Sequence, residues 1–216
     1  MLTNKLGFSW EQYYRAPIVG IVRSLPQDII FDIVAAYRDA GLTTIEITMN
    51  TEGAADIIKK LRSRFPELNV GAGTVCTLSD LEVAIQAGAQ FIVTPILNEE
   101  VVKIAVTQHI PIFPGCYTPT EIYKAWSLGA SAVKVFPATQ LGVQYIKDVL
   151  APLNQIKLLP TGGVSKENIR SFFEAGAIGV GMGSSLLNKT LVNNKDYEGL
   201  KNYFISIKEE IFEFLP

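Results

Sequence analysis

Hydrophobic and polar positions repeat along the chain as a unit: a short apolar run rich in β-branched residues, a turn, and an amphipathic stretch with helical spacing. The helical stretches begin near Ser, Thr, Asp or Pro and end at Gly, which are the usual start and stop signals of helices. The strand-like runs of eight such units cover residues 18–23, 43–50, 69–75, 91–95, 110–115, 131–137, 156–163 and 177–183.

Eight strand–helix units in 216 residues predict an α/β fold, a (β/α)8 TIM barrel in which helices surround a ring of parallel strands. We expect residues 1–15 to form an extra helix across the N-terminal end of the barrel. A doubly wound open sheet is the alternative arrangement. No change of composition marks a linker, so residues 1–216 are expected to form one domain.

Side chains on a barrel strand alternate between the interior and the surrounding helices, which gives each strand residue a predicted direction. The apolar positions of residues 43–50 and 131–137 face the helices, so the residues between them face inward. The inward-facing polar and aromatic side chains near the carboxyl ends of the strands are Glu46, Thr48, Asn50, Thr74, Lys134, Phe136 and Thr161. Barrel enzymes carry their chemistry at this end.

Lys134 stands out because it lies between Val133 and Val135 in an otherwise apolar strand. A structural interpretation is a lysine that extends to solvent or pairs with a carboxylate. A catalytic interpretation follows from burial, which lowers the pKa of an amine and leaves it neutral and nucleophilic toward a ketone. Glu46 is then the counter-ion of Lys134, the proton carrier of a Schiff-base reaction, or both, and we favour the catalytic interpretation.

Glycines and hydroxyls follow the last two predicted strands, in the sequences PTGGVS and GMGSSL. Glycine lets the backbone approach a ligand closely, and N–H groups of such loops bind phosphate. A Gly-Gly pair alone more often marks a turn. After strands seven and eight of a barrel, however, Gly162, Gly163 and Ser184 predict a phosphate site. Arg23, at the end of the first strand, would add positive charge for the phosphate or for a substrate carboxylate.

Composition and charge argue against several other classes of function. A formal net charge of −2 and a pI near 5.5, without a cluster of Lys and Arg, predict neither nucleic acid nor an anionic membrane as a partner. No signal peptide or membrane span is visible, so a cytoplasmic protein is expected. Cys76 and Cys116 lie too far apart in sequence for a metal or redox motif, and His109 precedes the fifth strand, at the opposite end of the barrel. We therefore expect no metal and no other cofactor.

Seven motifs in order cover nearly the whole chain: IEITMNTE, VGAGTV, FIVTP, FPGCYTPTE, VKVFPA, LPTGG and GMGSSL. This set resembles the 2-keto-3-deoxy-6-phosphogluconate/4-hydroxy-2-oxoglutarate aldolase family. The resemblance implies a class I aldolase, usually a homotrimer, that cleaves the phosphorylated keto-deoxy acid to pyruvate and glyceraldehyde 3-phosphate. The family name also implies cleavage of 4-hydroxy-2-oxoglutarate to pyruvate and glyoxylate.

The resemblance further implies roles for single residues. Lys134 matches the Schiff-base lysine, and Glu46 matches the general acid/base. The positions that match the residues around the substrate are Thr74, Pro95 and Thr161 for the pyruvate moiety, Phe136 beside the lysine, and Gly162, Gly163 and Ser184 for the phosphate.

Asn50 departs from the commonest pattern of the family, since gluconate-type members have an arginine at this position. Asparagine here, together with FPGC and GVQYIK, is similar to the branch that acts on 2-keto-3-deoxy-6-phosphogalactonate. The two substrates differ in configuration at one hydroxyl, and we expect the gluconate acid, with the galactonate acid as the alternative. A phosphosugar isomerase or epimerase, and a phosphate-ligand-binding barrel without catalysis, are the alternatives from other classes.

Overall fold

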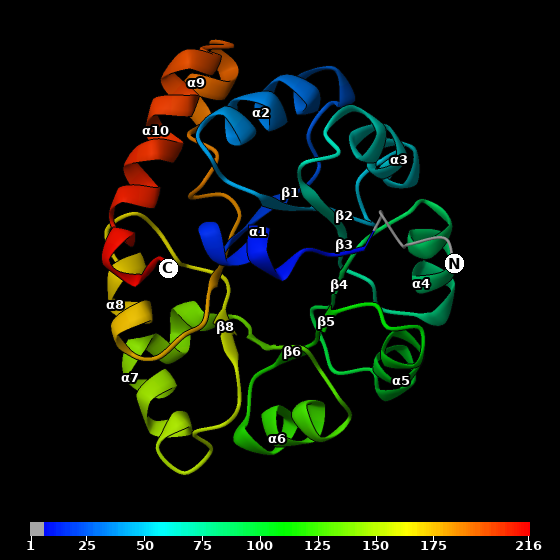
Figure 1. Ribbon diagram of the computed structural model, residues 1–216, viewed down its shortest axis with the longest axis vertical. Coiled ribbons are helices and arrows are strands. Elements are labelled where there is room, and N and C mark those ends of the chain that lie inside the picture. Colours follow the sequence, from blue (N-terminus) through cyan, green and yellow to red (C-terminus); the bar gives the residue numbers. More distant parts are fainter. Residues whose placement is uncertain (1–6) are drawn as a thin grey trace.

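Parallel strands form a closed ring in the computed structural model, which describes residues 7–216. The strands are β1 (Ile18–Val22), β2 (Thr44–Thr48), β3 (Asn69–Gly73), β4 (Ile92–Val93), β5 (Ile112–Phe113), β6 (Gly115–Cys116), β7 (Val133–Val135), β8 (Leu158–Pro160) and β9 (Val180–Met182). One sheet has the order β5-β4-β3-β2-β1-β9 and the other has the order β6-β7-β8. A parallel bridge between Thr161 and Gly181 joins β8 to β9, and β5 leads directly into β6, so the two sheets complete one ring (Figure 1).

The predicted fifth strand, residues 110–115, is interrupted at Pro114. Proline has no N–H to donate to a neighbouring strand, although its carbonyl still accepts a hydrogen bond from the Lys134 N–H at 2.9 Å. As a result, β5 pairs with β4 and β6 pairs with β7. The two pieces together fill one of eight positions in the ring, which confirms the predicted (β/α)8 barrel and excludes the open sheet.

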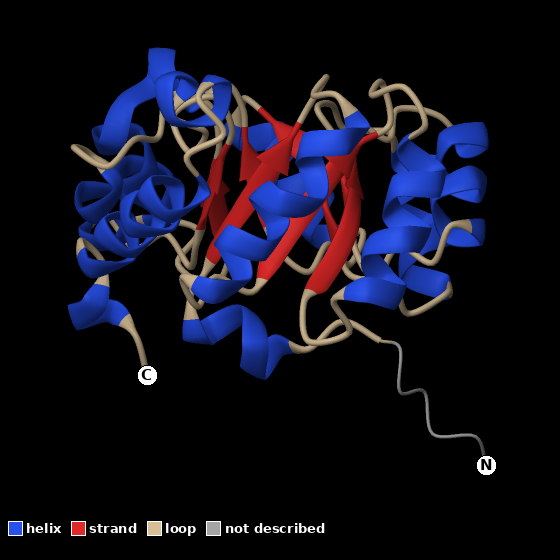
Figure 2. Ribbon diagram, turned by 90° about the horizontal axis from the view of Figure 1, so that it is seen from above, coloured by secondary structure: helices blue, strands red, loops and turns tan. Residues whose placement is uncertain are grey.

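Helices surround the ring. Figure 2 shows the strands enclosed by helices. They are α1 (Trp10–Arg15), α2 (Gln27–Asp39), α3 (Ala54–Arg64), α4 (Leu78–Gln86), α5 (Glu99–Thr107), α6 (Pro119–Ser127), α7 (Ala138–Leu150), α8 (Ile169–Glu174), α9 (Lys189–Asn193), α10 (Tyr197–Glu209) and a final 3-10 turn (Phe212–Phe214). Thr77 and Thr118 begin α4 and α6 with reciprocal capping boxes, so these helix starts follow from local sequence.

The strand side chains alternate between two sides of the ring as predicted, and each side has its own apolar cluster. Ile45 and Ile47 of β2 and Val133 and Val135 of β7 belong to the large cluster between the ring and the helices. The smaller cluster fills the barrel interior with Tyr13, Val19, Phe91, Val93, Phe113, Ala132 and Leu159. Because the apolar residues face the helices, the polar residues that alternate with them face the barrel interior.

Aromatic rings close the N-terminal end of the barrel. Tyr13 of α1 is fully buried, and its ring centroid lies 6.4 Å from that of Phe113. Phe8, just before α1, packs edge-on against Phe91 at 5.4 Å between centroids. Of the extra helix predicted for residues 1–15, the structure shows Trp10–Arg15, residues 7–9 precede the helix, and residues 1–6 lie outside the described part of the chain.

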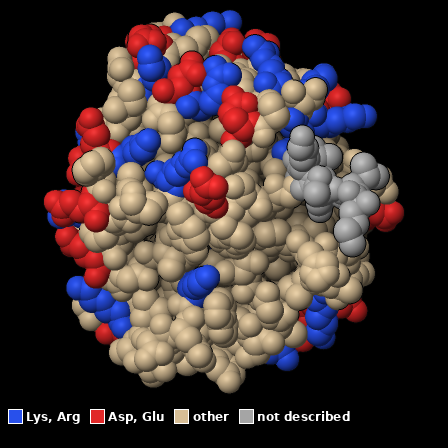
Figure 3. Space-filling view, viewed as in Figure 1, with Lys and Arg blue, Asp and Glu red and all other residues tan. Residues whose placement is uncertain are grey.

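Charged side chains of both signs gather at the top and left of the face seen in Figure 1, a few reach its middle, and the lower half carries fewer of them (Figure 3). Within residues 7–216, no helix is both long enough and apolar enough to span a membrane.

Candidate active site

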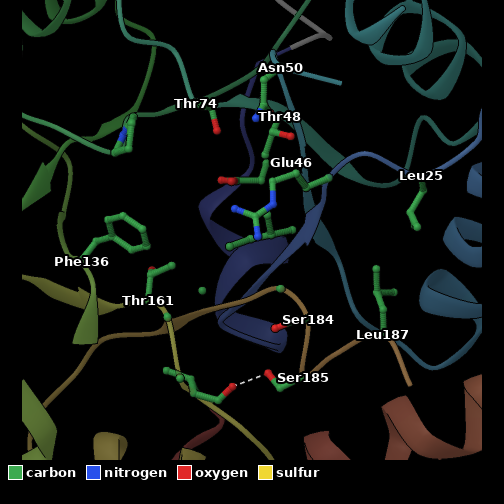
Figure 4. A pocket seen from close by; sticks show the side chains of 18 of the residues that line it. Leu25, Glu46, Thr48, Asn50, Thr74, Phe136, Thr161, Ser184, Ser185 and Leu187 are labelled. Carbon is green, nitrogen blue, oxygen red and sulfur yellow. Dashed lines mark hydrogen bonds between the residues drawn. The ribbon is translucent and has the colours of Figure 1, made fainter. Parts of the chain in front are cut away.

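A cavity of about 530 Å³ opens where the strands end at their carboxyl side. This size is typical of small-molecule sites. The structure brings all eleven residues singled out from the sequence to its wall: Arg23, Glu46, Asn50, Thr74, Pro95, Lys134, Phe136, Thr161, Gly162, Gly163 and Ser184. They come from strand ends far apart in the sequence, and Figure 4 shows Glu46, Thr74, Phe136 and Thr161 around one space.

Glu46 of β2 lies inside the barrel with only 2% of its surface exposed. Its Oε2 atom has no hydrogen-bond partner. Burial raises the pKa of this carboxyl to about 7, while the nearby Lys134 acts in the opposite direction. A carboxyl with a pKa near neutrality can both donate and accept a proton, which is what a general acid/base requires.

Lys134 of β7 is 6% exposed and faces the same cavity. Burial lowers its pKa, Glu46 raises it, and Arg23 lowers it. The Nζ atom lies 4.6 Å from the ring centroid of Phe136, which places that ring beside the amine as the family resemblance implied. The outcome is an amine that loses its proton more readily than a surface lysine, in contact with the space where a ketone could bind.

Thr74 and Thr161 approach the cavity from different strands. Thr74 follows β3 and has a φ of 58°, an unusual conformation for a β-branched residue that commonly marks functional loops. Thr161 follows β8 and is 3% exposed. Its side chain occupies the space above Gly181, where an added Cβ would stand 2.4 Å from the Thr161 Oγ1 atom.

The glycine-rich loop after β8 lines the cavity, and its conformation depends on glycine. Gly162 and Gly163 have φ values of 86° and 78°, which residues with side chains rarely adopt. Asn168 fixes the loop from behind, since its Nδ2 donates to the Gly163 carbonyl at 2.8 Å. The Ser185 hydroxyl donates to the Val164 carbonyl and links this loop to the one after β9. Gly162, Gly163 and Ser184 line the cavity, and backbone N–H groups of such loops can bind an anion.

A hydrogen bond of Ser24, the residue after Arg23, connects this part of the chain to the end of β2. The Ser24 N–H donates to the Thr51 hydroxyl at 3.0 Å, and the Thr48 and Thr51 hydroxyls share a hydrogen bond of 3.0 Å. Thr51 directly follows Asn50, so Arg23 and Asn50 line neighbouring parts of the cavity. Arg23 lowers the pKa of Lys134 electrostatically, so the guanidinium lies within electrostatic reach of that amine.

Several residues of the cavity wall were not singled out from the sequence. They are Ile21, Leu25, Thr48, Val164, Gly181, Gly183, Ser185, Leu187, Lys189, Val192 and Asn193. Thr48 was predicted to face inward but was given no role. Leu187 to Asn193 were missed because they follow the last strand, although the helix-capping residue Asn188 signals that α9 begins there. Lys189 adds a third basic side chain to a wall whose described residues include one carboxylate, Glu46.

Other reactive side chains lie elsewhere. His109 precedes β5 and lines a separate cavity of about 520 Å³ at the N-terminal end, together with Lys59 and Gln90. Over residues 7–216, no group of three or more His, Cys, Asp and Glu side chains is placed to hold a metal ion. The functional groups on the described cavity wall are two amines, a guanidinium, a carboxyl, amides, hydroxyls and backbone groups.

Comparison with known proteins identifies the family. Residues 11–203 match the family model described as KDPG and KHG aldolase. This chain belongs to that aldolase family. A 2-dehydro-3-deoxy-phosphogluconate aldolase of Haemophilus influenzae is 36% identical over 189 residues, covering 87% of this chain and 89% of the relative. A 2-dehydro-3-deoxy-6-phosphogalactonate aldolase of Escherichia coli is 35% identical over 174 residues, covering 80% and 85%.

A solved structure described as native KDPGal supports the same assignment to the aldolase family. It superimposes with a TM-score of 0.85 at 32% identity and covers 92% of this chain and 95% of its own. The gluconate and galactonate aldolases are thus similar to this chain to nearly the same degree. Membership of the family establishes an aldehyde-lyase, and the choice between the two sugar acids depends on the cavity itself.

Proposed function

We propose that this aldolase cleaves 2-keto-3-deoxy-6-phosphogluconate to pyruvate and glyceraldehyde 3-phosphate through a Schiff base on Lys134. The observation that carries the proposal is the placement of Lys134 and Glu46, each more than nine-tenths buried, on the wall of one cavity. Burial lowers the pKa of the amine and raises the pKa of the carboxyl, so the pair can reach the neutral forms that imine formation needs.

The proposed reaction starts when the neutral amine of Lys134 adds to the C2 ketone. The Glu46 carboxyl donates a proton as water leaves, which gives a protonated imine, and the Glu46 carboxylate then accepts the proton of the C4 hydroxyl. The C3–C4 bond breaks, its electron pair moves toward the imine, and the aldehyde is released. The remaining enamine takes a proton at C3, and addition of water to the imine releases pyruvate and restores the amine.

The rest of the cavity would bind the two ends of the substrate. Thr74, Pro95 and Thr161, with Phe136 beside the lysine, would surround the pyruvate half. The N–H groups of Gly162, Gly163 and Ser184 would bind the phosphate, with Arg23 and Lys189 as positive charges. Binding a phosphate remote from the reacting bond orients the substrate and can increase the rate as well as the affinity.

The galactonate acid is the second candidate substrate, because Asn50 stands where gluconate-type members have arginine and because a galactonate aldolase is 35% identical. Cleavage of 4-hydroxy-2-oxoglutarate is a further activity suggested by the family description. A phosphosugar isomerase or epimerase is less well supported, because it would use a pair of acid/base groups rather than one lysine with one glutamate.

We also propose a cytoplasmic homotrimer, as the family resemblance implies. Apolar side chains are exposed on the neighbouring helices α4, α5 and α6 and on the loops beside them: Leu78, Val83, Ile96, Ile104, Tyr117 and Tyr123. Ile96 and Tyr123 are 53% and 54% exposed. Such a surface is typical of a protein interface, and light scattering after size exclusion would test the subunit number.

Borohydride reduction in the presence of pyruvate tests the proposed function. Reduction converts the imine into a stable secondary amine, so peptide mass mapping should locate a pyruvate-derived adduct on Lys134. Lys134→Arg should abolish the adduct, whereas Lys157→Arg, on a lysine that does not line the cavity, should leave it unchanged. Absence of an adduct from protein that turns over substrate would contradict the Schiff-base mechanism.

A further inference from the structure

The inward face of β3 carries two glycines, and each leaves a space that a side chain from another strand fills. Gly71 pairs with Glu46 across β2 and β3, and Gly73 pairs with Thr48. A Cβ added at Gly71 would stand 2.5 Å from the Phe91 ring. A Cβ added at Gly73 would stand 2.3 Å from the Glu46 Oε1 atom and 2.7 Å from its Cδ. The carboxyl therefore lies against the Cα of Gly73, with the Phe91 ring occupying the deeper space.

Backbone conformation does not require glycine at position 73. The φ values of Gly162 and Gly163 lie in the left-handed region, whereas that of Gly73 does not. The next residue, Thr74, adopts a φ of 58° in spite of its side chain. Since an alanine could adopt the backbone of Gly73, the absence of a side chain is needed for space rather than for conformation.

No hydrogen bond holds the Oε2 atom of the Glu46 carboxyl, which is buried. Lys134, on β7, acts on it electrostatically, and Arg23 after β1 and Cys76 after β3 in turn act on Lys134. Packing against Gly73 is thus one constraint on where the carboxyl lies.

We propose that Gly73 is a positioning residue of the aldolase: the space left by its missing side chain holds the Glu46 carboxyl beside Lys134. This inference rests on the proposed function, in which Glu46 transfers protons. A methyl group at position 73 would push the carboxyl off the strand, and Phe91 blocks movement toward the floor. The carboxyl would move toward the open end of the cavity, where water would lower its pKa and where it would meet the substrate poorly.

Gly73→Ala is the direct test, with Gly20→Ala as its matched control. Gly20 lies on β1, and a Cβ there would stand 2.9 Å from the Tyr37 ring, on the helix side of the sheet. Both variants should lose stability, because each overpacks a strand glycine. Only Gly73→Ala should lower kcat/KM, by about 100-fold, which is the usual effect of a misplaced proton carrier.

The pH profile separates positioning from a general loss of stability. Cleavage needs the Glu46 carboxylate, so kcat/KM should fall as the pH drops through the pKa of this group. In Gly73→Ala, this acid limb should move to lower pH by one unit or more, and in Gly20→Ala it should stay in place. An unchanged limb together with a kcat/KM within threefold of the parent would overturn the proposal.

A double-mutant cycle on thermal unfolding tests the steric contact without relying on activity. In a Glu46→Ala background the carboxyl is gone, so Gly73→Ala should cost much less stability than it does in the parent. If Gly73→Ala alone fails to fold, recovery of folding in the double variant supports the contact. An equal cost in both backgrounds, or a double variant that also fails to fold, would refute it. A failed borohydride experiment on the parent would instead refute the proposed function and leave this steric result intact.

Discussion

Glu46→Gln should make the protein more stable at neutral and basic pH while removing its activity. The substitution keeps the shape of the side chain and removes its ionisation. Burial raises the pKa of Glu46 from an ordinary 4.5 to about 7, and the 2% exposure of the side chain means that solvent does little to reduce this effect. The folded protein therefore binds more protons than the unfolded chain between those two pH values.

The sign and the size of the effect follow from this difference. Stability due to the protonated carboxyl is fully present below about pH 4.5 and is lost as the pH rises through about 7. At about 1.4 kcal/mol per pKa unit, the full loss is about 3 kcal/mol, of which about 2.5 kcal/mol falls between pH 5 and pH 8. The advantage of Glu46→Gln over the parent should grow by that amount across this range.

Urea unfolding of both proteins at several pH values measures the difference. The same comparison in a Lys134→Met background separates the carboxyl from the amine. Lys134 lowers the pKa of Glu46, so the advantage of Gln at position 46 should be larger there. Stability curves that stay parallel within about 0.5 kcal/mol from pH 5 to pH 8 would show that the Glu46 carboxyl is not held above its ordinary pKa.

Three further predictions concern the substrate ends. The dephosphorylated analogue should show a kcat/KM lower by orders of magnitude, each tenfold being about 1.4 kcal/mol, and equal values would contradict the phosphate site. If Arg23 binds the substrate carboxylate, Arg23→Ala should weaken inhibition by pyruvate, and adding Asn50→Arg to that variant should partly restore it. If Arg23 binds only the phosphate, Arg23→Ala should leave pyruvate inhibition unchanged. Lys189→Ala should raise KM for the phosphorylated substrate by about tenfold or less, with a smaller effect at high salt, whereas Lys195→Ala should not.

The sequence predicted the parts of the site that depend on alternation along a strand. Ile45 and Ile47 assigned Glu46 to the interior, and Val133 and Val135 did the same for Lys134. Apolar side chains at every second position leave one physically acceptable orientation, since the other would expose them. Glu46 and Lys134 reached one cavity for this reason, whereas Gly162, Gly163 and Ser184 were chosen from the chemistry of the loops. The individual roles of all eleven residues remain predictions.

Features that depend on packing between distant segments could not be read in this way. The interruption of the fifth strand at Pro114 was missed, because the apolar residues around it look like one continuous strand. Gly73 gave no signal either, since a glycine in a strand has no side chain whose pattern could be followed. Its meaning depends on the Glu46 carboxyl and the Phe91 ring, and only the three-dimensional structure shows where these lie.

The aromatic floor of the barrel also has a kinetic consequence. Because Tyr13, Phe8 and their neighbours block the N-terminal end, both products must leave through the mouth by which the substrate entered. In the proposed reaction the pyruvate half is still bonded to Lys134 when the C3–C4 bond breaks, while the phosphorylated half is free and lies nearer the mouth. The aldehyde must therefore depart first and pyruvate second, and pyruvate should be the product that competes directly with the substrate for the empty enzyme.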